Sequence, residues 1–200
     1  MHAVVVGGHT RNIGKTSLAA GLIRAFPSLG WTAVKITQYG HGICSRDGKP
    51  CDCAPQTRPY LLTEEKDAAG HSDTSRFLAA GARRSLWLRA RQGQLADALP
   101  TLEAALATDE RVLIESNSIL EFIQPDLYLV VLDSSRPDFK ESARRYLARA
   151  DALITFAPLA LSRQWQELEA FLQKPTFRLP AGMDSIPALR DFVALKLDLT

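Results

Sequence analysis

The sequence has no long hydrophobic run, no large excess of one charge and no cysteine outside one short segment. Its 24 Lys and Arg residues nearly balance 22 Asp and Glu residues, so it lacks the basic bias typical of nucleic-acid-binding domains. No apolar stretch approaches the roughly 20 residues that cross a bilayer. The chain also starts without a basic segment leading into an apolar run, which argues against a secretory signal. We therefore expect a cytoplasmic protein that binds neither membranes nor nucleic acids.

The remaining composition suits one folded core. With 200 residues, 46% of them hydrophobic, the chain is predicted to form a single domain over residues 1–200. Short apolar strand patterns alternate with helical patterns along most of it, and this order predicts an α/β fold with a doubly wound, mostly parallel sheet. Residues 38–72 are rich in glycine, proline and mixed charges, and we expect a long irregular insertion there.

A glycine-containing stretch, GGHTRNIGKTS, separates the first strand pattern from the first helical pattern. It matches the phosphate-binding motif G-x-x-x-x-G-K-[ST], except that His9 stands where the first glycine belongs and Gly8 comes one residue too early. Because a buried strand precedes the stretch and an amphipathic helix begins at its end, we interpret it as a phosphate loop with one additional residue. The expected nucleotide-binding residues are Gly8, Asn12, Ile13, Gly14, Lys15, Thr16 and Ser17.

Three of these side chains have specific roles in this interpretation. Lys15 is expected to reach the β- and γ-phosphates, and the Thr16 hydroxyl to bind Mg²⁺. Ser17 adds a hydrogen bond to the α-phosphate. The alternative is a glycine turn that carries a surface lysine.

Further candidates lie where strands end or helices begin. Glu115 follows the apolar run 112–114, at the carboxyl end of a strand, where α/β sheets bind their ligands. Asp73 opens a helix and is a second candidate for the same Mg²⁺, since phosphoryl chemistry needs carboxylates near the metal. Lys35 ends the second strand and is expected to face the phosphates, so Lys15, Lys35 and Glu115 are the candidate catalytic residues. The alternatives are a helix cap at Asp73, a solvated strand end at Glu115 and an exposed lysine at Lys35.

All three cysteines lie within ten residues of one another. Cys44, Cys51 and Cys53 follow His41 in the segment HGICSRDGKPCDC. Clustered thiolates in a reduced compartment suit zinc or an iron–sulfur cluster. The C-x6-C-x-C spacing differs from the C-x2-C pairs of most zinc sites, and free loop thiols are the alternative. His41, His71 or a second chain would supply a fourth ligand.

Several of these segments resemble known families. The loop GHTRNIGKT resembles that of dethiobiotin synthetase and of cobyrinic acid amidating enzymes, which also have five residues between the glycines. Other segments are similar to the molybdopterin-guanine dinucleotide biosynthesis protein B family (MobB), namely AVKIT at 33–37, HSDTSRFLAAGA at 71–82, VLIES at 112–116 and DSIPALRDFVALKL at 184–197. Both resemblances imply a P-loop NTPase fold of the SIMIBI type. Ser116 departs from the glycine that follows the glutamate in MobB proteins.

The resemblances also imply function. The MobB likeness implies GTP binding, slow NTP hydrolysis, a nucleotidyltransferase partner, a role in molybdenum cofactor biosynthesis and a homodimer. The dethiobiotin synthetase likeness implies an ATP-dependent ligase in which Thr16, Asp73 and Glu115 hold Mg²⁺ and Lys35 contacts substrate or the γ-phosphate. A third possibility is a metal or iron–sulfur carrier that nucleotide binding switches. The sequence has no N-K-x-D guanine motif, so the choice between GTP and ATP stays open.

Overall fold

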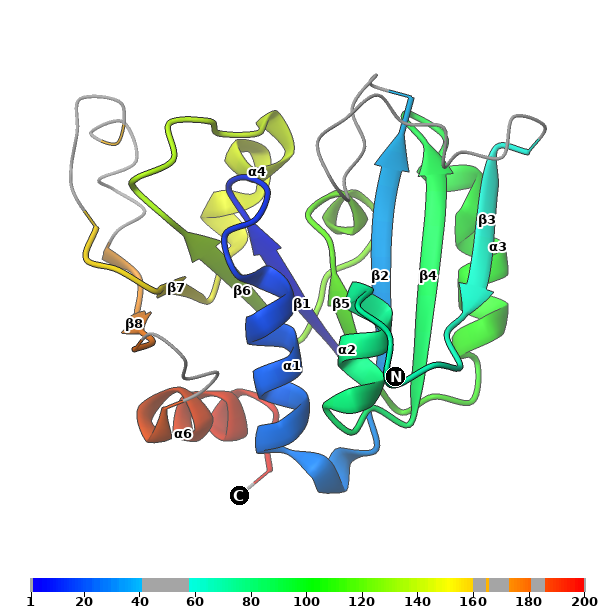
Figure 1. Cartoon of the computed structure of the whole chain (residues 1–200). Helices are drawn as coiled ribbons and strands as arrows, with labels where there is room; N and C mark the ends of the chain where they lie inside the picture. Colours follow the sequence, from blue (N-terminus) through cyan, green and yellow to red (C-terminus); the bar gives the residue numbers. More distant parts are fainter. Residues whose placement is uncertain (1, 41–57, 160–164, 166–172, 181–185, 200) are drawn as a thin grey trace.

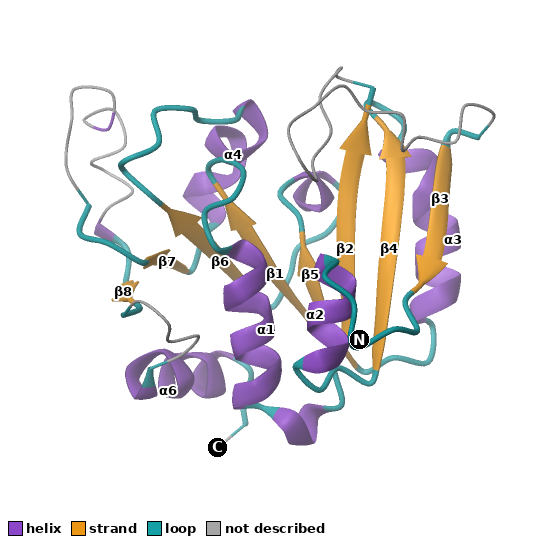
Figure 2. Cartoon of the chain, in the orientation of Figure 1, coloured by secondary structure: helices purple, strands orange, loops and turns teal. Residues whose placement is uncertain are grey.

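The chain folds around one central sheet with helices on both faces (Figure 1, Figure 2). The computed structural model describes residues 2–40, 58–159, 165, 173–180 and 186–199. The cysteine segment with His41 lies outside the described residues. None of the described helices is long and apolar enough to cross a membrane.

Eight strands form the sheet, in the spatial order β3-β4-β2-β5-β1-β6-β7-β8. All neighbouring strands run parallel except β3 and β4, which are antiparallel. This confirms the predicted doubly wound, mostly parallel sheet. The strands are β1 (His2–Gly8), β2 (Thr32–Tyr39), β3 (Tyr60–Glu64), β4 (Arg84–Arg91), β5 (Arg111–Glu115), β6 (Leu127–Leu132), β7 (Ala152–Thr155) and β8 (Thr176–Arg178).

The helices cover the two faces of the sheet in two groups. One face packs against α1, α2 and α6, and the other against α3 and α4. The helices are α1 (Lys15–Ala25), α2 (Asp73–Ala79), α3 (Leu95–Leu106), α4 (Glu141–Tyr146) and α6 (Pro187–Lys196), with short 3₁₀ turns η1 (Pro27–Leu29), η2 (Ser118–Glu121) and η3 (Leu147–Arg149).

Successive side chains of the central strands alternate between the two faces of the sheet, so each strand contributes to the hydrophobic core on both faces. On β1, Val4 and Val6 pack towards α1 while Val5 packs towards the α3 face, and all three are buried. Successive side chains of a strand point to opposite faces, and a parallel sheet covered on both faces is therefore apolar throughout. This explains why the central strands read as nearly continuous apolar runs.

The segment 38–72 is less irregular than its composition predicts. Strand β2 extends to Tyr39, and β3 forms an edge strand antiparallel to β4. Tyr60 and Leu62 of β3 pack against the core on the α3 side. A five-residue edge strand directly after Pro59 gives too weak a pattern to stand out in the sequence.

Candidate functional site

The glycine-containing loop connects β1 to the first turn of α1 at the carboxyl edge of the sheet. Gly14 caps α1 with φ 96°, and Asn12 also has a positive φ of 54°. No side chain caps α1, and the first N–H groups of a helix have no partner inside it. A Cβ on Gly14 would lie 2.4 Å from the Phe156 ring, so glycine is required there. The loop therefore presents a helix N-terminus to the adjoining pocket.

His9, the additional residue of the loop, is part of the core instead of the phosphate-facing surface. Its side chain is fully buried and contacts the rings of Phe139 and Trp165, each with centroids 5.2 Å away. Its backbone N–H donates to the Val131 carbonyl (3.2 Å), which continues the pairing of β1 with β6 by one residue. The longer spacing between the glycines thus extends the strand pairing by one residue. Burial lowers the pKa of His9.

The segment after β6 holds this loop from one side. The Lys140 backbone N–H donates to the His9 carbonyl (2.9 Å), and the Thr10 hydroxyl donates to the Asp138 carboxylate. Lys15 crosses the loop and donates to the Thr10 carbonyl (2.6 Å). Neither Asp138 nor Lys140 belongs to the sequence motif, yet both fix where the loop lies.

Asn117, in the turn after β5, holds the first glycine of the loop. Its amide oxygen accepts from the Gly8 N–H (2.9 Å), and its amide nitrogen donates to the Gly8 carbonyl (2.8 Å). Both backbone groups of Gly8 are therefore satisfied by one side chain. A side chain that pairs with backbone in this way positions the loop without contacting a ligand.

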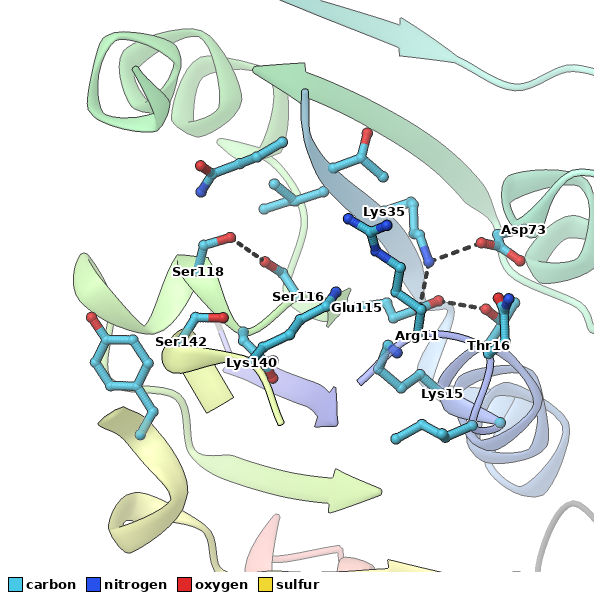
Figure 3. Close-up of a pocket in the computed structure, with 18 of the residues that line it drawn as sticks. Arg11, Lys15, Thr16, Lys35, Asp73, Glu115, Ser116, Ser118, Lys140 and Ser142 are labelled. Carbon is cyan, nitrogen blue, oxygen red and sulfur yellow. Dashed lines mark hydrogen bonds and ion pairs between the residues drawn. The ribbon is translucent and has the colours of Figure 1, made fainter. Parts of the chain in front are cut away.

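Lys35, Asp73, Glu115 and Thr16 converge beside the loop (Figure 3). Glu115 accepts from the Thr16 hydroxyl at Oε2 (2.8 Å) and pairs with the Lys35 ammonium at Oε1. The Lys35 ammonium also pairs with Asp73 (2.8 Å). Lys35 and Glu115 are neighbours because they occupy paired positions of β2 and β5. The structure thus brings together four of the residues expected from the sequence.

Electrostatics fixes the charge of this cluster. Burial alone would lower the pKa of Lys35, but the Glu115 and Asp73 carboxylates raise it above its usual range. Burial would raise the pKa of Asp73, but the Lys35 ammonium lowers it. Burial lowers the pKa of Lys15 to about 8. Lys35 is therefore a firmly protonated cation held between two acids.

The structure also decides between alternatives for these side chains. Ser72, and not Asp73, caps α2, because its hydroxyl accepts from the Ser75 N–H (3.0 Å). The Lys35 side chain is only 15% exposed and that of Glu115 only 2%. The helix-cap interpretation of Asp73 and the solvated interpretations of Lys35 and Glu115 are thus wrong.

These residues line one wall of a cavity of about 810 Å³. Ser17 and Arg76 also line it, and the Arg76 guanidinium donates to the Ser17 hydroxyl (3.0 Å). The opposite wall consists of residues that follow β5 and residues at the start of α4. A cavity of this size falls in the usual range for small-molecule sites.

The donor set beside the loop fits a magnesium ion. One hydroxyl and two carboxylates, from Thr16, Glu115 and Asp73, surround one region, and Mg²⁺ prefers such hard oxygen ligands completed by water and phosphate oxygens. Among the residues that the structure describes, no group of three or more His, Cys, Asp or Glu side chains is placed to hold a metal. The fit is therefore to a phosphate-linked Mg²⁺ and not to a protein-only metal cage.

Sequence reasoning missed three residues that shape the site, which are Asn117, Asp138 and Lys140. None belongs to a phosphate-loop motif, so no spacing reveals them. The available signal is topological, since all three follow the carboxyl ends of β5 and β6, at the edge where α/β sheets bind ligands.

Comparisons with known proteins give likenesses of fold only. No protein-family model matches the sequence, and no curated protein matches it. A solved structure of a MobB protein homolog from Bacillus stearothermophilus is 18% identical, with full coverage of both chains and a TM-score of 0.47.

Two longer proteins are also similar in structure. LpxK from Aquifex aeolicus, in complex with ATP, is 19% identical, and the match covers 89% of this chain and 53% of that one, with a TM-score of 0.49. The 54-kDa protein of the signal recognition particle from Aeropyrum pernix, in complex with GDP, is 16% identical, with 99% and 46% covered and a TM-score of 0.47. The sheet order of this chain, with the loop between β1 and α1, is that of a doubly wound α/β fold.

Proposed function

We propose that this chain binds a nucleoside triphosphate together with Mg²⁺ at the loop and hydrolyses it slowly. The observation that carries the proposal is the meeting of the uncapped α1 N-terminus with Lys15, Thr16 and the Lys35–Glu115 pair in one cavity. A helix N-terminus favours anions, and the lysine and hydroxyl are the groups that P-loops direct at phosphates and metal.

Each side chain has a task in this site. Lys15 neutralises the β- and γ-phosphates, and the loop N–H groups bind their oxygens. Lys35, held between Glu115 and Asp73, brings a second positive charge towards the terminal phosphate. A bound Mg²⁺, held by Thr16, Glu115 and Asp73, supplies charge neutralisation on the leaving phosphate oxygens.

The same contacts account for slow turnover. Both carboxylates of the cluster are paired with Lys35, and Glu115 also accepts from Thr16. A general base needs a free lone pair within hydrogen-bond reach of the attacking water. Neither Glu115 nor Asp73 is free in this way, so we expect nucleotide binding to be far more evident than hydrolysis.

Equilibrium titration tests the proposal. Fluorescent ATP and GTP are titrated into the protein with Mg²⁺ and with EDTA, and phosphate release is followed on the same sample. We expect saturable binding that weakens when Mg²⁺ is removed. The absence of saturable binding for both nucleotides would rule out the proposal.

A more specific role is supported by sequence segments alone. Their resemblance to the MobB family favours GTP over ATP and a nucleotidyltransferase as partner in molybdenum cofactor synthesis. Competition of unlabelled GTP and ATP for the same site tests the first point, and co-purification with a molybdenum-cofactor nucleotidyltransferase tests the second. Preference for ATP would instead favour an ATP-dependent ligase of the dethiobiotin synthetase kind.

The size of the cavity favours a second candidate, an ATP-dependent ligase of the dethiobiotin synthetase kind. The wall opposite the loop carries polar side chains that a triphosphate bound at the loop would not use, among them Ser118 and Ser142. A ligase needs such a wall to hold the molecule that it activates. Formation of ADP only when a carboxylic acid is added would support this candidate.

A further inference from the structure

The cavity beside the loop has two walls with different electrostatic character (Figure 3). The first wall contains Lys35 with its two carboxylates. The second contains Lys140 together with the hydroxyls of Ser116, Ser118 and Ser142. Because Lys15 and Thr16 mark where the terminal phosphate and its metal would lie, the second wall lies beyond that phosphate.

Lys140 is fixed in place on this second wall. Its backbone N–H donates to the His9 carbonyl (2.9 Å), so its position is tied to the loop itself. Its side chain lines the cavity, and Figure 3 shows it directed from the start of α4 towards Glu115 and Arg11. A ligand that contacts Lys140 would therefore lie next to the terminal phosphate.

The Lys140 ammonium forms no ion pair with any carboxylate that the structure describes. The nearby Asp138 carboxylate accepts from Thr10, and the adjacent Glu141 pairs with Arg145 (3.0 Å). Burial and, to a smaller extent, the neighbouring charges of Lys15 and Arg11 together lower the pKa of Lys140 to about 8. A partly buried cation that lacks a counter-ion costs free energy, and an anionic ligand would remove that cost.

The hydroxyls around Lys140 suit the same kind of ligand. The Ser116 and Ser118 hydroxyls lie 3.3 Å apart after β5, and Ser142 follows Lys140 by two residues in the first turn of α4. Hydroxyl groups donate hydrogen bonds to phosphate or carboxylate oxygens, and a lysine binds such a group as a point charge. Among the described residues that line the cavity, Glu121 is the one carboxylate that forms no ion pair, and it is exposed.

We propose that Lys140, Ser116, Ser118 and Ser142 form a second-ligand site that binds the phosphate or carboxylate group of an acidic small molecule beside the terminal phosphate of the nucleotide. The site rests on the proposed nucleotide function, since the nucleotide forms its inner boundary. It extends that function by assigning the chemical class of a second ligand.

Lysine footprinting reads both sites separately in one experiment. The protein is saturated with Mg²⁺ and the non-hydrolysable β,γ-imido analogue of the better-binding nucleotide, and its amines are labelled briefly with an N-hydroxysuccinimide ester at neutral pH. Mass spectrometry then gives the labelling of each lysine with and without orthophosphate or succinate. The analogue should protect Lys15, and the added anion should protect Lys140, each by about tenfold when its site is nearly full.

Variants separate the site from a general salt effect. In the nucleotide-saturated protein, Lys140→Met should lose the binding of the added anion, measured by ligand-observed NMR, and Lys140→Arg should restore part of it. Lys66→Met removes an exposed lysine that pairs with Glu64, and it should leave anion binding unchanged. Ser142→Ala should weaken anion binding by a smaller factor.

Each outcome has one meaning. Protection of Lys140 by orthophosphate alone identifies a phosphate ligand, and protection by succinate alone identifies a carboxylate. Protection of Lys15 without protection of Lys140 by either anion overturns the second-ligand site and leaves the nucleotide function standing. Failure of the analogue to protect Lys15 overturns the nucleotide function itself.

Discussion

Lys35 and Lys140 line the same cavity, but their surroundings differ in charge. Lys35 lies between the Glu115 and Asp73 carboxylates, whereas Lys140 pairs with no described carboxylate. Burial acts on both amines, yet the carboxylates raise the pKa of Lys35, while the pKa of Lys140 is lowered to about 8. The first wall is electrostatically complete without a ligand, and the second is not. The comparison indicates that the charges of the first wall balance one another, whereas on the second wall an anionic ligand would supply the counter-charge for Lys140.

The largest expected effect comes from breaking the Lys35–Glu115 ion pair of the first wall. Glu115→Gln removes the charge that balances the buried Lys35, and loss of one partner of a buried ion pair typically costs about 3–5 kcal/mol. Because Asp73 still pairs with Lys35, we expect the free energy of unfolding to fall by about 3 kcal/mol, measured by urea denaturation.

An exposed ion pair is the control for this effect. Glu64→Gln removes a carboxylate that pairs with Lys66 and Arg84 at the surface, and such pairs contribute only about 0–1 kcal/mol. If Glu115→Gln and Glu64→Gln lowered the free energy of unfolding equally, the buried ion pair of the first wall would contribute no more than an exposed one, and the prediction would be wrong.

A second prediction concerns the lysine of the loop, which belongs to neither wall. Lys15→Ala removes the charge-assisted interaction expected with the β- and γ-phosphates, which is worth about 1.5–3 kcal/mol in total. Nucleotide affinity should therefore fall roughly 10- to 150-fold in titrations with Mg²⁺ present. Circular dichroism and the melting temperature should show a folded protein, and normal affinity would overturn the phosphate-loop assignment.

A third prediction concerns Asn117, which holds the loop between the two walls. Asn117→Ala removes both hydrogen bonds to Gly8, and at roughly 1 kcal/mol each the free energy of unfolding should fall by about 2 kcal/mol. Asn117→Asp is the matched variant, because it keeps an acceptor for the Gly8 N–H but loses the donor to the Gly8 carbonyl. An Asp variant as stable as the natural protein would show that only one of the two bonds matters.

The sequence predicts the residues of the first wall better than those of the second wall, for a physical reason. Thr16 belongs to a motif, and Glu115 ends the apolar strand β5. Lys35 is expected at the end of its strand but lies inside β2 (Thr32–Tyr39), where it occupies the position paired with Glu115 on the neighbouring parallel strand. Local pattern and one topological rule are enough to bring them together. The structure adds the finding that Lys35 and Asp73 form an ion pair, since side-chain pairing across elements leaves no trace in spacing.

The second wall depends on contacts that local sequence does not encode. Lys140 and Asp138 reach the loop because the segment after β6 folds back over His9 and Thr10. The burial of His9 follows from its packing against Phe139 and Trp165, which are distant in sequence. Loop paths and long-range packing decide these positions, and neither has a periodic signal.

The smallest predicted effect is the contribution of Lys140 to the pH dependence of stability, which tests the contrast between Lys140 and Lys35. The groups that act on Lys140 are Lys15, Arg11 and Lys35, which lower its pKa together with burial, and Asp138, which raises it. In the ligand-free protein the folded pKa is about 8 and the ordinary value is 10.5. Between these values the unfolded chain binds more protons than the native state, so this residue makes stability rise with pH. Below about pH 8 its full destabilising effect is present.

Lys140→Met removes this effect, so the variant should be more stable than the natural protein at pH 7, by on the order of 1 kcal/mol after screening by solvent. The advantage should shrink as the pH rises from about 8 towards 10.5. Urea denaturation of both proteins at several pH values measures the difference, and contributions from groups that do not interact with Lys140 cancel in it. A variant less stable at pH 7 would show that Lys140 has a counter-charge in the native protein, and the contrast with Lys35 would then be lost.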